Sequence, residues 1–191
     1  MRLAVQLKKG HVYRTKDFAK WTANPARLVK RLAGEGLLVR LGHGLYVHPE
    51  TSKFGKVPPT DDELMRGFLE DAPFVFSGPE KWNALGLGST AMFATPLVYN
   101  TKRSGLFELG GRSYLLSRAK FPKQPTPEWF AVDLLENHDK AGVSLETLRD
   151  GLKKALRERR LREDGLREAA AAYGTQETRS LVKAVVESRA S

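Results

Sequence analysis

The sequence predicts an α+β protein, in which an N-terminal winged helix-turn-helix is followed by a small antiparallel sheet packed with helices. Two short helical patterns are followed by two β-prone runs, which is the order of a helix-turn-helix with a wing. Further along, β-prone runs separated by glycines alternate with amphipathic helical stretches. Positive charge is concentrated near the N-terminus, which indicates two domains, residues 1–56 and residues 57–191, the second ending in a helical tail.

The charge is distributed unevenly along the 191 residues, which carry 32 Lys and Arg against 22 Asp and Glu. Residues 1–56 hold twelve basic and three acidic residues, a net charge of +9. Residues 57–191 hold twenty basic and nineteen acidic residues, a net charge of +1. Such segregation predicts a polyanion-binding module beside an electrically balanced one.

Several classes of site and location are excluded or disfavoured by composition. The chain contains no cysteine, so disulfides, zinc–thiolate sites and thiol catalysis are absent. The four histidines, His11, His43, His48 and His138, do not pair at metal-ligand spacing, so we expect no metal, no cofactor and no enzymatic activity. No apolar run is long enough to span a membrane, and the N-terminal apolar stretch is too short for a secretory signal. We therefore expect a cytoplasmic protein that does not enter a membrane.

Two short helices are predicted in the first domain. Thr15 is a good N-cap for a helix over residues 16–21. Asn24 caps a second helix that begins at Pro25, because proline suits the first helical position, and that ends at the following glycines. Apolar side chains recur on one face of this second helix and leave basic residues on the other, namely Arg27, Lys30 and Arg31.

A β-hairpin is predicted directly after these helices. Residues 37–41 and 45–48 are short β-prone runs, joined by Gly42-His43-Gly44. Two helices followed by a two-stranded wing form a winged helix-turn-helix, whose second helix fits the major groove of duplex DNA. The residues expected to contact DNA are Arg14, Lys16, Thr22, Asn24, Ala26, Arg27, Lys30, Arg31, Arg40 and His43. Arg27 is the candidate for reading guanine, whereas Lys30 and Arg31 are expected to hold phosphates.

The second domain is predicted to follow a linker at residues 54–60. Helices are expected from Asp61, from Pro79, over residues 128–138, from Leu145 and around residues 181–186. Strands are expected at 74–76, 97–101, 106–109 and 114–116, the last three antiparallel. Three carboxylates on one predicted helix are interpreted as surface charges, namely Glu128, Asp133 and Glu136. Three basic residues on predicted turns either extend the DNA surface across the second domain or only increase solubility: Lys102, Arg103 and Arg112.

Three segments of the chain are similar to a known family. The stretch LVKRLAGEGLLVRLGHGLYVHP, residues 28–49, resembles the helix, wing and terminal G-x-Y-x-x-P of AbiEi-type antitoxins of type IV toxin–antitoxin systems. SGPEKWNALGL and TPLVYNTKRSG within residues 76–105, and PEWFAVDLLEN at residues 127–137, resemble parts of their second domain. The resemblance covers most of the chain up to about residue 160 and leaves the helical tail unmatched.

The resemblance implies a bacterial antitoxin with two functions. Its winged helix would bind inverted repeats in its own promoter and repress the operon. Its second domain would antagonise a nucleotidyltransferase toxin encoded beside it, with or without a stable complex. Two other functions remain open: a protein-interaction adaptor that uses the winged helix as a docking face, and a nucleic-acid-processing enzyme with its site in the second domain.

Overall fold

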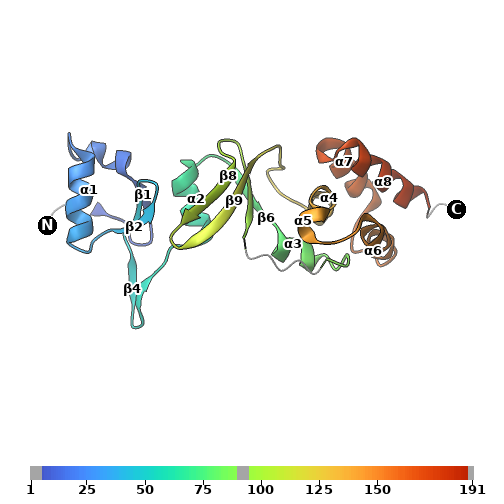
Figure 1. Cartoon of the computed structure of the whole chain (residues 1–191), viewed down its shortest axis with the longest axis horizontal. Coiled ribbons are helices and arrows are strands. Elements are labelled where there is room, and N and C mark those ends of the chain that lie inside the picture. The colour runs from blue at the N-terminus through green and yellow to red at the C-terminus, as the bar shows by residue number, and fades with distance from the viewer. Residues whose placement is uncertain (1–5, 90–94, 189–191) are drawn as a thin grey trace. The chain divides into compact units, whose positions relative to one another are not determined.

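The computed structural model describes residues 6–89 and 95–188, and its helices and strands are labelled in Figure 1. The fold is α+β, as predicted. The chain forms two compact units, unit 1 from Met1–Pro73 and Lys102–Tyr114, and unit 2 from Phe74–Thr101 and Leu115–Ser191. The units therefore do not divide at residue 56, where the sequence placed the boundary, and the expected outer limits of the domains fall outside the described residues.

The N-terminal part of unit 1 contains the predicted helices and hairpin. A 3₁₀ helix, η2 (Thr15–Lys20), precedes α1 (Pro25–Gly34), and β2 (Val39–Gly42) pairs antiparallel with β3 (Leu45–Val47). A third strand, β1 (Val12–Arg14), pairs with the other edge of β3 and was not predicted, because three residues are too few to show a β period. The core between these elements is formed by Leu7, Tyr13, Phe18, Leu28, Val29, Leu32 and Leu38.

A second hairpin occupies the segment predicted as a linker. Strand β4 (Glu50–Ser52) pairs antiparallel with β5 (Gly55–Val57), and every residue of both strands is exposed. The linker prediction is therefore wrong for residues 54–57. This hairpin could not be predicted from the hydrophobic pattern, because neither strand buries a face and no apolar alternation marks it.

Helix α2 (Asp61–Leu69) belongs to unit 1 because it packs closely against β1. It begins at Thr60, whose hydroxyl accepts from the backbone N–H of Glu63 at 3.2 Å. A Cβ atom added at Gly67 would lie 2.5 Å from Cγ1 of Val12, so only glycine permits this approach. The segment 102–114, with β8 (Gly105–Leu109), also joins unit 1, since the Gly110 N–H donates to the Leu41 carbonyl at 2.8 Å.

Unit 2 contains β6 (Phe74–Ser77), β7 (Leu97–Asn100) and the end of β9 (Arg112–Arg118). Strands β6 and β7 are antiparallel, but β7 and β9 are parallel, with Leu97 opposite Leu115. The predicted antiparallel order is therefore wrong for this pair. In the sheet order, β7 is followed by β9 and not by β8, which comes between them in the sequence. The chain therefore returns to the edge of β7 in the same direction as β7.

Five helices follow the sheet, and α4 (Pro127–Glu136) is buried on almost every side. The others are α5 (His138–Ala141), α6 (Leu145–Arg157), α7 (Glu163–Tyr173) and α8 (Gln176–Glu187), while α3 (Pro79–Ala84) lies between β6 and β7 in sequence. Helix α6 ends at Arg157, so the charged segment after it does not extend the helix. Helix α7 supplies Leu166, Ala169 and Ala170 to the core.

Two of the three carboxylates predicted as surface charges are buried in α4. Glu128 is 4% exposed and accepts from the Arg162 backbone N–H at 3.0 Å, and Asp133 is 6% exposed. Asp133 accepts hydrogen bonds from four side chains that join β6, α3 and β7 to α4, namely Ser77, Trp82, Tyr99 and Asn137. Burial raises the pKa of Asp133, and the hydrogen bonds from Ser77, Tyr99 and Trp82 oppose that shift. Its surroundings are those of a structural carboxylate. Glu136 is exposed, as predicted.

Across residues 6–89 and 95–188, no helix is both long and apolar enough to cross a membrane. Over the same residues, no group of three or more His, Asp and Glu side chains is arranged to hold a metal ion.

Gly67→Ala should destabilise unit 1, although alanine is the better helix former by about 1 kcal/mol. The added methyl group meets Val12, and overpacking costs about 1–3 kcal/mol, so we expect a net loss of up to about 2 kcal/mol. The measurement is the midpoint of thermal unfolding followed by circular dichroism.

Gly34→Ala is the matched control, because a Cβ atom at the end of α1 has no neighbour within 4 Å. Its midpoint should stay unchanged or rise. Equal midpoints for the two variants would show that α2 does not depend on the close contact with β1.

Candidate nucleic-acid interface

The N-terminus of α1 is fixed by two short polar links. The Thr22 hydroxyl accepts from the backbone N–H of Asn24 at 3.1 Å, and the Asn24 side chain accepts from the backbone N–H of Arg27 at 3.1 Å. Pro25 occupies the first helical position, where its missing N–H costs no hydrogen bond. The helix therefore begins where the sequence placed it, with its first turn held rigidly.

Helix α1 presents one apolar face and one basic face. Leu28, Val29 and Leu32 are buried in the core of unit 1. The opposite face is exposed and carries four of the predicted contact residues, namely Ala26, Arg27, Lys30 and Arg31. Arg31 lies 3.8 Å from Glu35, one turn further on, and such an exposed pair contributes little to stability. The structure therefore brings these four residues together on one accessible surface.

A shallow concave surface of about 410 Å³ lies beside the start of α1. Thr22, Asn24, Arg27 and Arg31 line it, together with Leu28 and Trp21. The Lys20 ammonium group lies 4.1 Å from the centre of the Trp21 ring, a cation–π contact that adds a further positive charge here. Lys20 and Trp21 were not predicted as site residues.

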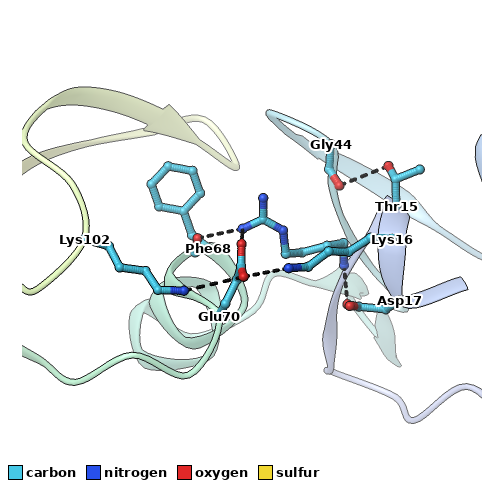
Figure 2. Close-up of polar contacts among 8 residues, drawn as sticks. Thr15, Lys16, Asp17, Gly44, Phe68, Glu70 and Lys102 are labelled. Atoms are coloured by element: carbon cyan, nitrogen blue, oxygen red, sulfur yellow. Dashed lines mark hydrogen bonds and ion pairs between the residues drawn. The ribbon is translucent and has the colours of Figure 1, made fainter. Parts of the chain in front are cut away.

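The predicted contact residues Arg14 and Lys16 are held by an acid at the end of α2. The Glu70 carboxylate forms ion pairs with Arg14 at 2.8 Å, with Lys16 at 2.6 Å and with Lys102 at 3.5 Å. Figure 2 shows Lys16 and Lys102 approaching it from different segments of the chain. Arg14 also donates to the Phe68 carbonyl at 3.0 Å, and its backbone N–H donates to Asp17 at 2.7 Å. These contacts fix β1 and η2 against α2.

The three cations strongly favour the ionised form of Glu70. The hydrogen bond from Lys16, with the charges of Arg14 and Lys102, lowers the pKa of Glu70 to about 2. Arg14 and Lys16 therefore differ from the basic residues of α1, because an internal carboxylate already compensates part of their charge.

Unit 1 also contains Lys102, Arg103 and Arg112, which the sequence analysis assigned to the second domain. Arg103 stacks over the Phe68 ring at 4.6 Å. Arg112 pairs with Asp61 and donates to the Pro59 carbonyl at 2.9 Å. All three residues contact other groups of unit 1, so they do not form a basic surface on the second domain.

The two predicted wing residues lie in different surroundings. Arg40 is exposed on β2, opposite Tyr46 of β3. His43, in the turn between these strands, has its ring 6.1 Å from that of Phe68 and 5.8 Å from that of Phe107. The turn is therefore packed against α2 and β8 of the same unit.

Comparison of the chain with known protein families and with curated proteins finds no match.

Glu70→Gln should lower the midpoint of thermal unfolding at neutral pH and should change how that midpoint varies with pH. A carboxyl whose pKa is lowered by folding stabilises the fold above its ordinary pKa near 4.5, and this stabilisation is lost as the pH falls toward 2. The difference between wild type and variant should therefore be largest above about pH 5 and should shrink toward zero near pH 2. Calorimetry over this pH range measures it.

Glu168→Gln, at an exposed position of α7, is the control for removing a carboxylate, and its offset from wild type should be small at every pH. A Glu70→Gln offset that stayed constant with pH would contradict the ion cluster.

Proposed function

We propose that this protein binds duplex DNA through unit 1, which we interpret as a winged helix-turn-helix with α1 as its recognition helix. The observation that carries the proposal is the exposed basic face of α1 beside its capped N-terminus. Arg27, Lys30 and Arg31 are exposed there, and the nearby surface includes Lys20.

The order of elements supports this interpretation. The 3₁₀ helix η2 packs on α1 and the β2–β3 hairpin follows, an order of elements that supports a helix-turn-helix with a wing. Recognition helices place their N-terminal residues against base edges in the major groove. The N-terminus of α1 also carries the positive end of the helix dipole, which favours phosphate.

Different residues are assigned different roles on this surface. Arg27, in the first turn of α1, is the candidate for the bidentate contact with guanine. Lys30 and Arg31 lie further along the helix and are assigned to phosphates, which position the protein without reading sequence. Arg14 and Lys16 are assigned to the structure of unit 1, because Glu70 holds both.

Charge reversal on α1, Arg27→Glu with Arg31→Glu, should weaken binding to duplex DNA by at least about 10-fold, since one good base contact alone is worth about 1–3 kcal/mol. The measurement is fluorescence anisotropy with labelled DNA from directly upstream of the protein's own gene, at several salt concentrations. Affinity of the wild type should fall steeply with salt, because each neutralised phosphate releases counterion.

The matched control is Arg149→Glu with Arg167→Glu, which reverses two exposed charges on α6 and α7 of unit 2. It should weaken binding much less, and circular dichroism should show that both double variants fold. Equal losses in the two would reject α1 as the recognition helix. A salt-independent complex with a protein, and none with DNA, would favour the docking-module alternative.

We further propose, from the resemblance of residues 28–49, 76–105 and 127–137, that the protein is an autoregulating antitoxin. It would repress its own operon and oppose a nucleotidyltransferase toxin encoded beside it.

If so, the adjacent reading frame should encode a nucleotidyltransferase that arrests bacterial growth when it is expressed alone. Co-expression of this protein should restore growth, and a reporter driven by the upstream DNA should be repressed in the same cells. The Arg27→Glu, Arg31→Glu variant should lose repression while still restoring growth, because the resemblance assigns toxin antagonism to the second domain. Growth arrest that this protein does not relieve would reject the antitoxin assignment and leave DNA binding untouched.

A further inference from the structure

We infer that the β4–β5 hairpin is a second DNA-contacting element, whose tip inserts Phe54 between or against bases while Lys53 and Lys56 hold phosphates. This inference rests on the proposed DNA binding by α1 and extends it to a segment that the sequence analysis treated as a linker. Figure 1 shows the hairpin, in cyan, projecting from unit 1.

The tip exposes a large apolar ring that the fold of unit 1 does not use. Phe54 is 89% exposed, more than Leu106 at 65% or Val57 at 40%, the other large apolar side chains exposed in the described part of the chain. All residues from Glu50 to Pro58 are exposed, so the hairpin contributes no side chain to a core at these positions. An aromatic ring presented in this way is a candidate for contact with a partner.

The charge around the ring selects the class of partner. Lys53 and Lys56 flank Phe54, and the sequence has no acid from residue 51 to residue 60. Lys53 lies 5.0 Å from the centre of the Phe54 ring, and in the described residues neither lysine forms an ion pair. Lysine is depleted in the cores of protein–protein interfaces, whereas a ring between cations suits a polyanion with flat bases.

Hydrogen bonds fix the backbone of the turn that carries these side chains. The Ser52 hydroxyl accepts from the backbone N–H of Phe54 at 3.1 Å and donates to the Gly55 carbonyl at 3.2 Å. Gly55 has φ of 112°, a conformation that favours glycine, and Ser52 and Gly55 are directly paired. Little conformational entropy of the turn is therefore lost when it binds.

The tip of the β2–β3 hairpin, by contrast, already contacts other parts of unit 1. The Leu41 carbonyl accepts from Gly110, and His43 packs against Phe68 and Phe107. The β4–β5 hairpin projects instead, so its tip is more accessible to DNA than the tip of the β2–β3 wing. Proteins that insert apolar side chains between base steps combine them with nearby cations in this way.

The test uses the full chain and a fluorescent duplex of about 30 base pairs and mixed sequence, with affinity measured by anisotropy across a salt series. Phe54→Ala should weaken binding by about 5-fold or more, the lower end of what a stacked ring contributes, because the cost of unstacking base pairs in a duplex offsets part of the gain. It should leave the salt slope unchanged. Phe54→Trp, which keeps a stacking ring, should retain the affinity. Lys53→Gln with Lys56→Gln should lower the magnitude of the salt slope by about 2.

The charge control is Lys154→Gln with Lys183→Gln, which removes two exposed lysines from unit 2 and should leave the slope nearly unchanged. Suppose that Arg27→Glu with Arg31→Glu abolishes binding, but neither Phe54→Ala nor Lys53→Gln with Lys56→Gln changes it. This result would overturn the role of the hairpin and leave the proposed function standing. A wild-type chain that binds no duplex would reject the proposed function and this inference with it. A dimer in light scattering that Phe54→Ala converts to monomer, with unchanged DNA affinity, would assign the ring to self-association and also overturn the inference.

Discussion

The Glu70 carboxylate is the interaction on which the architecture of unit 1 depends. Arg14, Lys16 and Lys102 come from three separate segments of the chain and converge on this one acid (Figure 2). Without an anion here, three positive charges would lie together at the end of α2 and repel one another. Glu70 itself sits in the left-handed conformation that ends the helix, with φ of 57°, so the end of α2 and the position of the charge are set by the same residue.

This cluster separates the basic residues of unit 1 by what they can do. A cation that already has a carboxylate beside it gains less from a phosphate, because the existing contact must be given up or shared. The cations on α1 lie on an open helical surface, where Glu35, in a weak pair with Arg31, is the only acid that contacts one of them within residues 6–89 and 95–188. Under the proposed function, the overall charge favours a polyanionic partner, and local neutralisation favours the face of α1 as its binding surface.

Local signals in the sequence located most elements, and long-range contacts account for what it missed. Asn24 with Pro25 is a capping pattern that acts within four residues, so α1 begins where predicted, and α2 also begins at the predicted Asp61. The contact of Glu70 with Lys102 spans 32 residues, and no spacing rule reports it. Asp133 was wrongly predicted to be a surface charge. Apolar residues surround it in the sequence, and a helix that is apolar on all sides is buried, so the sequence did contain a signal for its burial.

The path of the chain between the two units has a consequence for how the protein is made. Unit 1 is completed only by residues 102–114, which follow the first strands and helix of unit 2 in sequence. On the ribosome, the first 73 residues are therefore synthesised before Lys102, Arg112 and Tyr114, and Glu70 and Asp61 gain these partners only when the later segment has also been made. Final assembly of the N-terminal unit is thus coupled to translation of the segment inserted after β7, and neither unit is a continuous stretch of chain that could be exchanged between proteins by a single join.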